Sequence, residues 1–313
     1  MLLYVLKRIV TTIPVLVVVA LIIFGILYMT PGDPALILAG DNATPQQVEQ
    51  VRQRLGLDKG FVPRFYEWSS DVVTGNLGTS LYTGLPVVTM IGQRLLPTLC
   101  LVLLTFLIAI SVAVPLGVVA ATRHGSLIDR FAMLTSVLGF SVPVFVVGYI
   151  LAYIFGLKLG WLPVQGFANP QNGIWPFISS LILPSSALAS LYVALISRIT
   201  RSAMLEILGQ DYIRTARAKG LGETTVIFLH ALKNAAVPIS TVVGLGFASL
   251  LGGAVVIETV FSIPGLGLLM VTSILSRDYP VIQGVLLLFS ITYVVLNLLI
   301  DLLYGLFDPR IRY

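Results

Sequence analysis

Long uninterrupted apolar runs constrain what this chain can fold into more than any other feature of its sequence. A helix of about 20 residues is as long as the hydrocarbon core of a bilayer is thick, roughly 30 Å. Six runs of this kind occur, near residues 9–30, 97–121, 131–157, 176–197, 236–257 and 281–305. We therefore expect an all-α membrane protein with six transmembrane helices.

The composition agrees with a lipid environment. The 313 residues are 57% hydrophobic and 11% charged, which is more apolar surface than one water-soluble core can bury. Cys100 is the single cysteine, so the chain can form no internal disulfide and no thiolate cluster. Lys7 and Arg8 precede the first run as in a secretory signal, but the run is too long, and Thr30–Pro34 offers no cleavage pattern. We expect this run to be retained as a helix.

Basic residues are distributed unevenly among the segments that join the runs. If the N-terminus is cytoplasmic, the inward-facing segments carry twelve of the nineteen: Lys7, Arg8, Arg123, Arg130, Arg198, Arg201, Arg214, Arg217, Lys219, Lys233, Arg310 and Arg312. Five others lie in 31–96, where six acidic residues outnumber them. The positive-inside rule therefore predicts that both termini are cytoplasmic and that 31–96 is an extracytoplasmic loop.

Short helices are expected within this loop. Thr44–Leu57 has Thr44 as an N-cap, Pro45 in the first turn and Gly56 as a stop. We interpret the loop as a small extracytoplasmic cap.

Motifs of soluble enzymes are missing. No lysine is followed by Ser or Thr, so the chain lacks a GxxxxGK[ST] phosphate loop, and neither HExxH nor GxSxG occurs. His124 and His230 lack metal-ligand spacing. The placement of the charges, rather than nucleic-acid binding, accounts for the net charge of +5. We expect no catalytic residue, metal site, cofactor or nucleic-acid partner in this chain.

Residues 198–235 form the most polar of the inward-facing segments. Met204, Leu208, Tyr212 and Ala216 recur every four residues while charged residues fall on other faces, which predicts an amphipathic helix that Gly220 and Gly222 end. Such a helix could lie on lipid headgroups or could dock on a partner protein.

This segment also carries a resemblance to a known family. Asp211–Leu221 (DYIRTARAKGL), His230–Ala235 (HALKNA) and Pro238 resemble the cytoplasmic EAA loop of ABC importer permeases, in particular those of the peptide, glutathione and nickel uptake family. Similar matches, which extend the resemblance over essentially the whole chain, lie at Pro31–Pro34, Thr259–Gly267, Arg277–Gln283 and Asp308–Tyr313. The chain departs from the broader pattern at Arg214–Ala216, which stands for Glu-Ala-Ala, and at Lys233, which stands for proline.

The resemblance implies a function and a set of partners. Residues 1–313 would be one transmembrane domain, a permease subunit that forms half of the path for short peptides; glutathione, nickel chelates or opines are the alternatives. A second homologous permease, two ABC ATPase subunits with ATP and magnesium, an extracytoplasmic solute-binding protein and membrane lipid would be its partners. The complex would lie in the plasma membrane of a bacterium, the inner membrane if the cell is Gram-negative.

Within residues 198–235, here named the coupling segment, the resemblance implies a helix around 205–222 that sits in a groove of the ATPase. The residues it assigns to coupling are Arg214, Thr215, Ala216, Arg217, Lys219 and Gly220. Gly220 matches the glycine of the motif, and glycine permits a positive φ and a close approach of two backbones. Motion of the ATPase would then tilt the flanking helices between inward-open and outward-open states.

Polar residues inside the apolar runs are candidates for the path. Glu258, Asn297 and Asp301 would be costly in lipid, although Glu258 and Asp301 could also lie at the hydrated interface. Pro264, Gly265 and Gly267 predict a tight turn that could gate the path or simply be a rigid connection. An ion-coupled transporter or channel is the rival from another class, but we find neither the paired charges nor the inverted repeats that it predicts.

Overall fold

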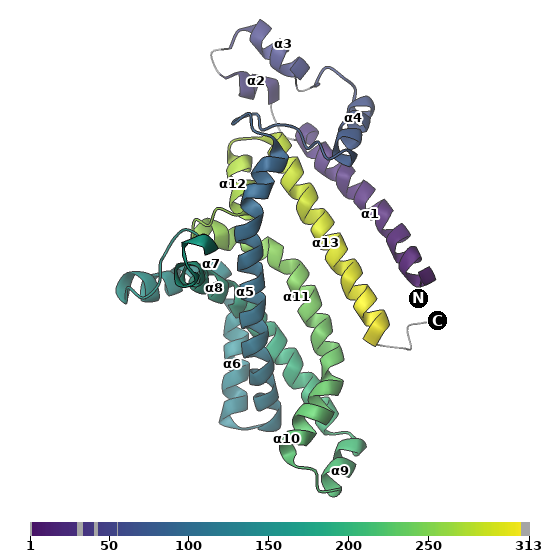
Figure 1. The fold of residues 1–313 in the computed structure, drawn as a ribbon, viewed down its shortest axis with the longest axis vertical. Helices are drawn as coiled ribbons and strands as arrows, with labels where there is room; N and C mark the ends of the chain where they lie inside the picture. The colour runs from purple at the N-terminus through teal and green to yellow at the C-terminus, as the bar shows by residue number, and fades with distance from the viewer. Residues whose placement is uncertain (1, 30–33, 41–42, 55, 308–313) are drawn as a thin grey trace. The chain divides into compact units, whose positions relative to one another are not determined.

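The computed structural model describes residues 2–29, 34–40, 43–54 and 56–307. These residues are largely helical, with one isolated β-bridge between Thr79 and Pro86 (Figure 1). The elements are α1 (Leu2–Met29), α2 (Pro34–Ala39), α3 (Pro45–Arg54), α4 (Phe61–Val73), α5 (Val87–Thr122), α6 (Leu127–Ser141), α7 (Val144–Leu151), the π-helical η1 (Ala152–Lys158), the 3₁₀ turn η2 (Pro170–Asn172), α8 (Ile174–Leu208), α9 (Asp211–Ala218), α10 (Glu223–Thr225), the π-helical η3 (Val226–Leu232), α11 (Lys233–Val260), α12 (Leu266–Leu275) and α13 (Tyr279–Phe307).

The predicted all-α class is confirmed, and most of the apolar runs coincide with long helices. Among the described residues, four helices are long and apolar enough to cross a membrane: Val87–Thr122, Ile174–Leu208, Glu223–Phe247 and Tyr279–Ile300. The pair α6 and α7–η1 makes a fifth if it counts as one span. The apolar stretch of α1, Val10–Ile26, is shorter. Six spans therefore remain a prediction.

The expectation of one helix over residues 131–157 is wrong. Two helices occupy the run, and they meet at an angle of 105° (Figure 1). Val142 and Pro143 separate them with extended backbones, at ψ 121° and 139°. Proline has no N–H to continue a helix and disfavours helical geometry at the preceding residue, so the chain bends here.

The chain divides into two compact units, which are described separately. The first comprises residues 1–95 and 269–298. Here Phe24 of α1 is almost fully buried, and its ring centroid lies 5.3 to 5.4 Å from those of Phe61, Phe65 and Trp68. These aromatic contacts hold α4 on α1. The predicted cap of α3 is confirmed, since Thr44 N–H donates to Gln47 Oε1 at 2.8 Å and Gln47 N–H donates to Thr44 Oγ1 at 3.4 Å.

The second unit comprises residues 96–268 and 299–313, and α8 is its central helix. Helix α8 packs on α6, α7 and α11. Leu181, Leu188 and Ile196 of α8 are fully buried in the main core cluster, which also contains Leu250 and Ile257 of α11. Burial of these side chains holds α8 in place, and the coupling segment begins in the last part of this helix.

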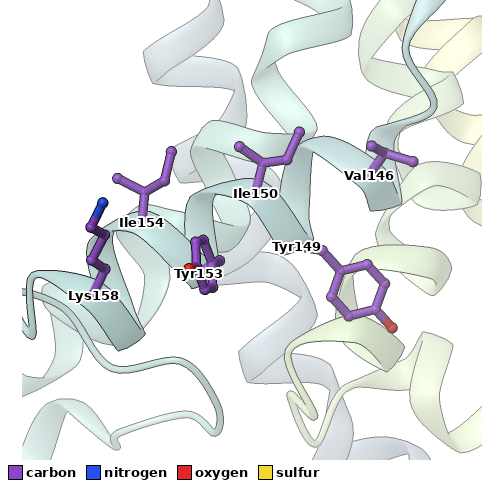
Figure 2. Close-up of a pocket in the computed structure, with 6 residues that line it drawn as sticks. All are labelled: Val146, Tyr149, Ile150, Tyr153, Ile154 and Lys158. Carbon is purple, nitrogen blue, oxygen red and sulfur yellow. The ribbon is translucent and has the colours of Figure 1, made fainter.

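One side of α7 and η1 is not covered by other helices among the described residues. Figure 2 shows Val146, Tyr149, Ile150, Tyr153, Ile154 and Lys158 along a groove of about 630 Å³. Outward-facing apolar side chains, with Tyr and Lys among them, are typical of helices that contact lipid.

Candidate functional site

The coupling segment contains a break that the four-residue pattern did not predict. Helix α8 ends at Leu208, and α9 begins at Asp211 after Gly209 and an extended Gln210 (φ −75°, ψ 150°). The expectation of one helix from Met204 to Ala216 is therefore wrong. Asp211 favours the start of a second helix here, because an acidic side chain in the first turn complements the helix dipole.

The inner face of α9 is packed against the rest of the second unit. Ile213 is fully buried and Ala216 nearly so, in a cluster with Met204, Val226 and Ala235. Tyr212, which the pattern placed on this face, is instead 43% exposed. Its hydroxyl accepts a 3.0 Å hydrogen bond from Asn234 Nδ2, so α9 is also joined to the start of α11.

The other predicted coupling residues lie on the exposed side or at the end of α9. Arg214 pairs with Asp211 at 3.3 Å, and their side chains are 75% and 94% exposed. Thr215 donates its hydroxyl hydrogen to Asp211 O. Arg217 pairs with Glu223 at 2.6 Å, and this contact raises the pKa of the Arg217 guanidinium.

Gly220 ends α9 as predicted, with a φ of +79°. Gly220 N–H donates to Arg217 O and Leu221 N–H donates to Ala216 O, which together form a Schellman motif after the C-cap residue Lys219. A Cβ at Gly220 would meet no atom within 4 Å. The positive φ, and not crowding within this chain, is therefore what favours glycine here.

Glu258 is completely buried at the end of α11. Its carboxylate accepts a 2.6 Å hydrogen bond from Thr98 Oγ1 and a 3.0 Å hydrogen bond from Leu268 N–H. Thr98 Oγ1 accepts in turn from Leu266 N–H at 2.8 Å. The carboxylate and the threonine together bind the first turn of α12.

The turn over residues 264–267 wraps closely around this carboxylate. Pro264 is half-buried, whereas Gly265 and Gly267 are buried. A Cβ at Gly265 would collide with the Glu258 carboxylate, and one at Gly267 would collide with the Val255 backbone. Glycine is required here for close approach. Thr98 was not singled out from the sequence, where a threonine inside an apolar run gives no signal of its partner.

The remaining predicted residues contribute less to a defined site. Asn297 is half-buried within α13. Asp301 lies in the same helix, but its side chain is outside the described residues, as are residues 31–33 and 308–313 of the matched motifs. Where the chain is described, no group of three or more His, Cys, Asp or Glu side chains is placed to hold a metal ion.

Comparison with known proteins accounts for the whole length of the chain. Residues 113–313 match the family described as "Binding-protein-dependent transport system inner membrane component", and residues 1–113 match the N-terminal model of the same membrane component. The chain is 50% identical to "Probable peptide ABC transporter permease protein y4tP" of Sinorhizobium fredii, with 99% of each chain covered. It is 42% identical to "Glutathione transport system permease protein GsiC" of Escherichia coli K12, with both chains fully covered.

A solved structure shares the fold at low sequence identity. A chain of the MetNI methionine ABC transporter, in an inward facing conformation, superposes with a TM-score of 0.58 and 17% identity. The likeness covers 71% of this chain and 97% of that one. The family matches and the two close relatives establish that the chain is a membrane protein of the binding-protein-dependent transport system inner membrane component family, the permeases of ABC importers.

Proposed function

We propose that this permease forms half of the translocation path of an ATP-driven importer of short peptides. It crosses the membrane six times with both termini in the cytoplasm, and residues 1–313 form one transmembrane domain. The six apolar runs and the excess of basic residues in the inward-facing segments support this topology. The full complex contains a second homologous permease, two ATPase subunits that hold ATP and magnesium, and an extracytoplasmic solute-binding protein.

The two faces of α9 are the observation that carries the proposal. Ile213 and Ala216 anchor one face in the protein core, while Asp211 and Arg214 extend from the other into open space. A short helix that is rigidly held on one side and exposed on the other can transmit a push from a partner protein without deforming. We assign Arg214, Thr215, Arg217, Lys219 and Gly220 to the surface that meets the ATPase, with Ala216 as an anchor.

The turn around Glu258 is assigned to the gate at the extracytoplasmic end of the path. Its hydrogen bonds to Thr98 and Leu268 join α5 to the end of α11 and the start of α12, so these parts would move as one piece. Glu258 therefore acts by holding Pro264, Gly265 and Gly267 in place. Asn297 and Asp301 of α13 are assigned to the lining of the path.

Short peptides are the favoured substrate because the relative named as a peptide permease shares 50% identity with this chain. Glutathione, itself a tripeptide, is the second candidate, because the chain is 42% identical to a glutathione permease over its whole length. Nickel chelates and opines complete the set. The binding protein from a neighbouring gene, titrated by calorimetry with a dipeptide, a tripeptide, glutathione, an opine and a nickel chelate, distinguishes among them.

Transport in vesicles tests the mechanism. The permease pair is reconstituted with and without the ATPase subunits, and uptake is measured with the binding protein outside and nucleotide inside. We expect uptake only when the ATPases are present and ATP is hydrolysed. Uptake by the permeases alone, or with a non-hydrolysable nucleotide over many turnovers, would contradict the proposal and favour an ion-coupled transporter or a channel.

A further inference from the structure

An ion pair with a buried carboxylate joins the turn between α5 and α6 to α8. The side chain of Asp129, in the first turn of α6, is 5% exposed. Its Oδ1 accepts from Arg201 Nε, and its Oδ2 accepts from Arg201 Nη2 at 2.8 Å and from Gly125 N–H at 2.9 Å. Two parallel N–H···O bonds fix the direction of a guanidinium as well as its distance.

Neighbouring groups complete this cluster. His124 Nδ1 lies 3.0 Å from Arg201 Nη2 and 3.1 Å from Asp129 Oδ2, with its side chain 64% exposed. Ser126 Oγ caps α6 by accepting from Asp129 N–H. Asp129 is thus bound by the turn on one side and by α8 on the other, while His124 covers the cluster at its solvent edge.

A second polar contact joins the same helices deeper in the unit. Ser136 Oγ of α6 lies 3.1 Å from Ser197 Oγ of α8, and both side chains are buried. Ser197 lies about one helical turn before Arg201, and Ser136 lies about two turns after Asp129. Two polar contacts at different heights prevent α6 from sliding or rotating on α8.

Arg201 lies close to the coupling helix α9 along the chain. Arg201 stands seven residues before the end of α8 at Leu208, and α9 follows after two further residues. A displacement of α9 therefore enters α8 through its last two turns, where Met204 and Leu208 pack in the same cluster as Ile213, and Arg201 lies about one turn beyond Met204. We propose that the Asp129–Arg201 pair is a transmission element, through which α8 and the α5–α6 turn move together when the ATPase displaces the coupling segment.

This inference rests on the proposed function, because it assigns positioning residues to the same coupling process. A variant that lacks the two parallel N–H···O bonds between Asp129 and Arg201 loses the contact that fixes the α5–α6 turn on α8, so this turn would detach from α8. The ATPase could then still bind α9 and hydrolyse ATP. Only part of the helix bundle would follow its motion.

Two variants separate transmission from assembly. Asp129→Asn keeps the shape of the side chain and removes its charge, and Arg201→Lys keeps the charge and removes the planar fork. Arg130→Gln is the matched control, since Arg130 is exposed and adjacent to Asp129. We expect both test variants to assemble with the ATPases and to hydrolyse ATP within about twofold of wild type. Substrate moved per ATP should fall at least tenfold in each, and the double variant should be no worse than the singles.

A reversible disulfide between α6 and α8 tests whether the transport lost in Asp129→Asn can be restored. The Ser136→Cys/Ser197→Cys pair, in a Cys100→Ala background, places two thiols where the hydroxyls are 3.1 Å apart, which suits a disulfide between α6 and α8. If α6 and α8 move as one body, oxidation leaves wild-type transport intact and restores transport per ATP to Asp129→Asn, and a reducing agent reverses the rescue.

The outcomes distinguish this inference from the proposed function. Loss of transport on cross-linking would show that α6 and α8 must separate, and would overturn the inference. Coupling that is unchanged in both Asp129→Asn and Arg201→Lys would overturn it as well, while the proposed function would stand. If the wild-type complex shows no ATP-dependent uptake at all, both fall. Asp129→Asn alone could fail to assemble with the ATPases. In that case the test is Asp129→Asn with the oxidised cysteine pair, and this form would contradict the inference if it assembled but moved no more substrate per ATP.

Discussion

Thr98 of α5 donates a 2.6 Å hydrogen bond to the carboxylate of Glu258, at the end of α11, and both side chains are buried. The same hydroxyl accepts from Leu266 N–H. One side chain therefore serves a carboxyl acceptor and a backbone donor, each of which would lose one hydrogen-bond partner away from water without it. Such a position is sensitive to the loss of a single oxygen atom.

We expect Thr98→Val to destabilise the protein by about 1–3 kcal/mol, because valine has nearly the same shape but leaves Leu266 N–H without its acceptor and Glu258 with one donor fewer. The melting temperature of the purified permease in detergent measures the effect. Thr105→Val is the matched control in the same helix, since the buried Thr105 hydroxyl has no hydrogen-bond partner among the described residues. Equal melting temperatures for the two variants would contradict the role assigned to Thr98.

Gly267→Ala should also destabilise the protein, by about 1–3 kcal/mol, because the new Cβ would collide with the backbone of Val255, which cannot rotate away. The comparison variant is Gly252→Ala in α11, where an added Cβ meets no atom within 4 Å. Alanine there should be neutral or slightly stabilising, since it favours a helix. Thermal unfolding of the two variants side by side measures the difference. A Gly267→Ala protein as stable as wild type would mean that the turn is not held around Glu258.

Local signals in the sequence predicted several features correctly. Thr44 and Gln47 form the expected cap of α3, and Gly220 adopts the positive φ expected of a helix stop. Each of these depends on residues that are close together in the chain. Local backbone geometry and hydrogen bonding decide such features, so a short stretch of sequence is enough to recognise them.

Contacts between distant residues could not be predicted in the same way. Thr98 and Glu258 are 160 residues apart, and Asp129 and Arg201 are 72 apart. Which helices are neighbours depends on packing of apolar surfaces that look alike in sequence, so nothing local indicates these partners. The break at Gly209 and Gln210 was missed for a related reason. Burial of Ile213 in the core cluster outweighs the four-residue pattern that would have continued α8.

The assignment of Gly220 to the ATPase surface predicts different results for different substitutions. Gly220→Trp should insert normally but lose ATPase binding or transport, because a large ring would occupy the open space that the partner enters. Backbone strain must be separated from this effect, since a non-glycine residue at a φ of +79° costs about 1–2 kcal/mol. Gly220→Asn is the control, because asparagine tolerates this conformation. Co-purification of tagged ATPase and uptake in vesicles are the measurements. Normal assembly and transport by Gly220→Trp would show that the docking assignment is wrong.

In the first unit, Asp278 is buried and ties the 76–86 loop to the start of α13. Its Oδ2 accepts from Ser80 Oγ at 2.5 Å, and its Oδ1 accepts from Leu81 N–H at 3.0 Å. Asp278→Asn replaces Oδ2 with an NH2 group that cannot accept the hydrogen bond from Ser80 Oγ, so the loop should open more often. Tyr82, which is 80% exposed, then gives a direct measurement, because chymotrypsin cleaves after tyrosine in mobile segments. We expect at least fivefold faster cleavage after Tyr82 in Asp278→Asn, and no change in Asp71→Asn, whose side chain is exposed. Equal cleavage rates would mean that the carboxylate does not hold the loop.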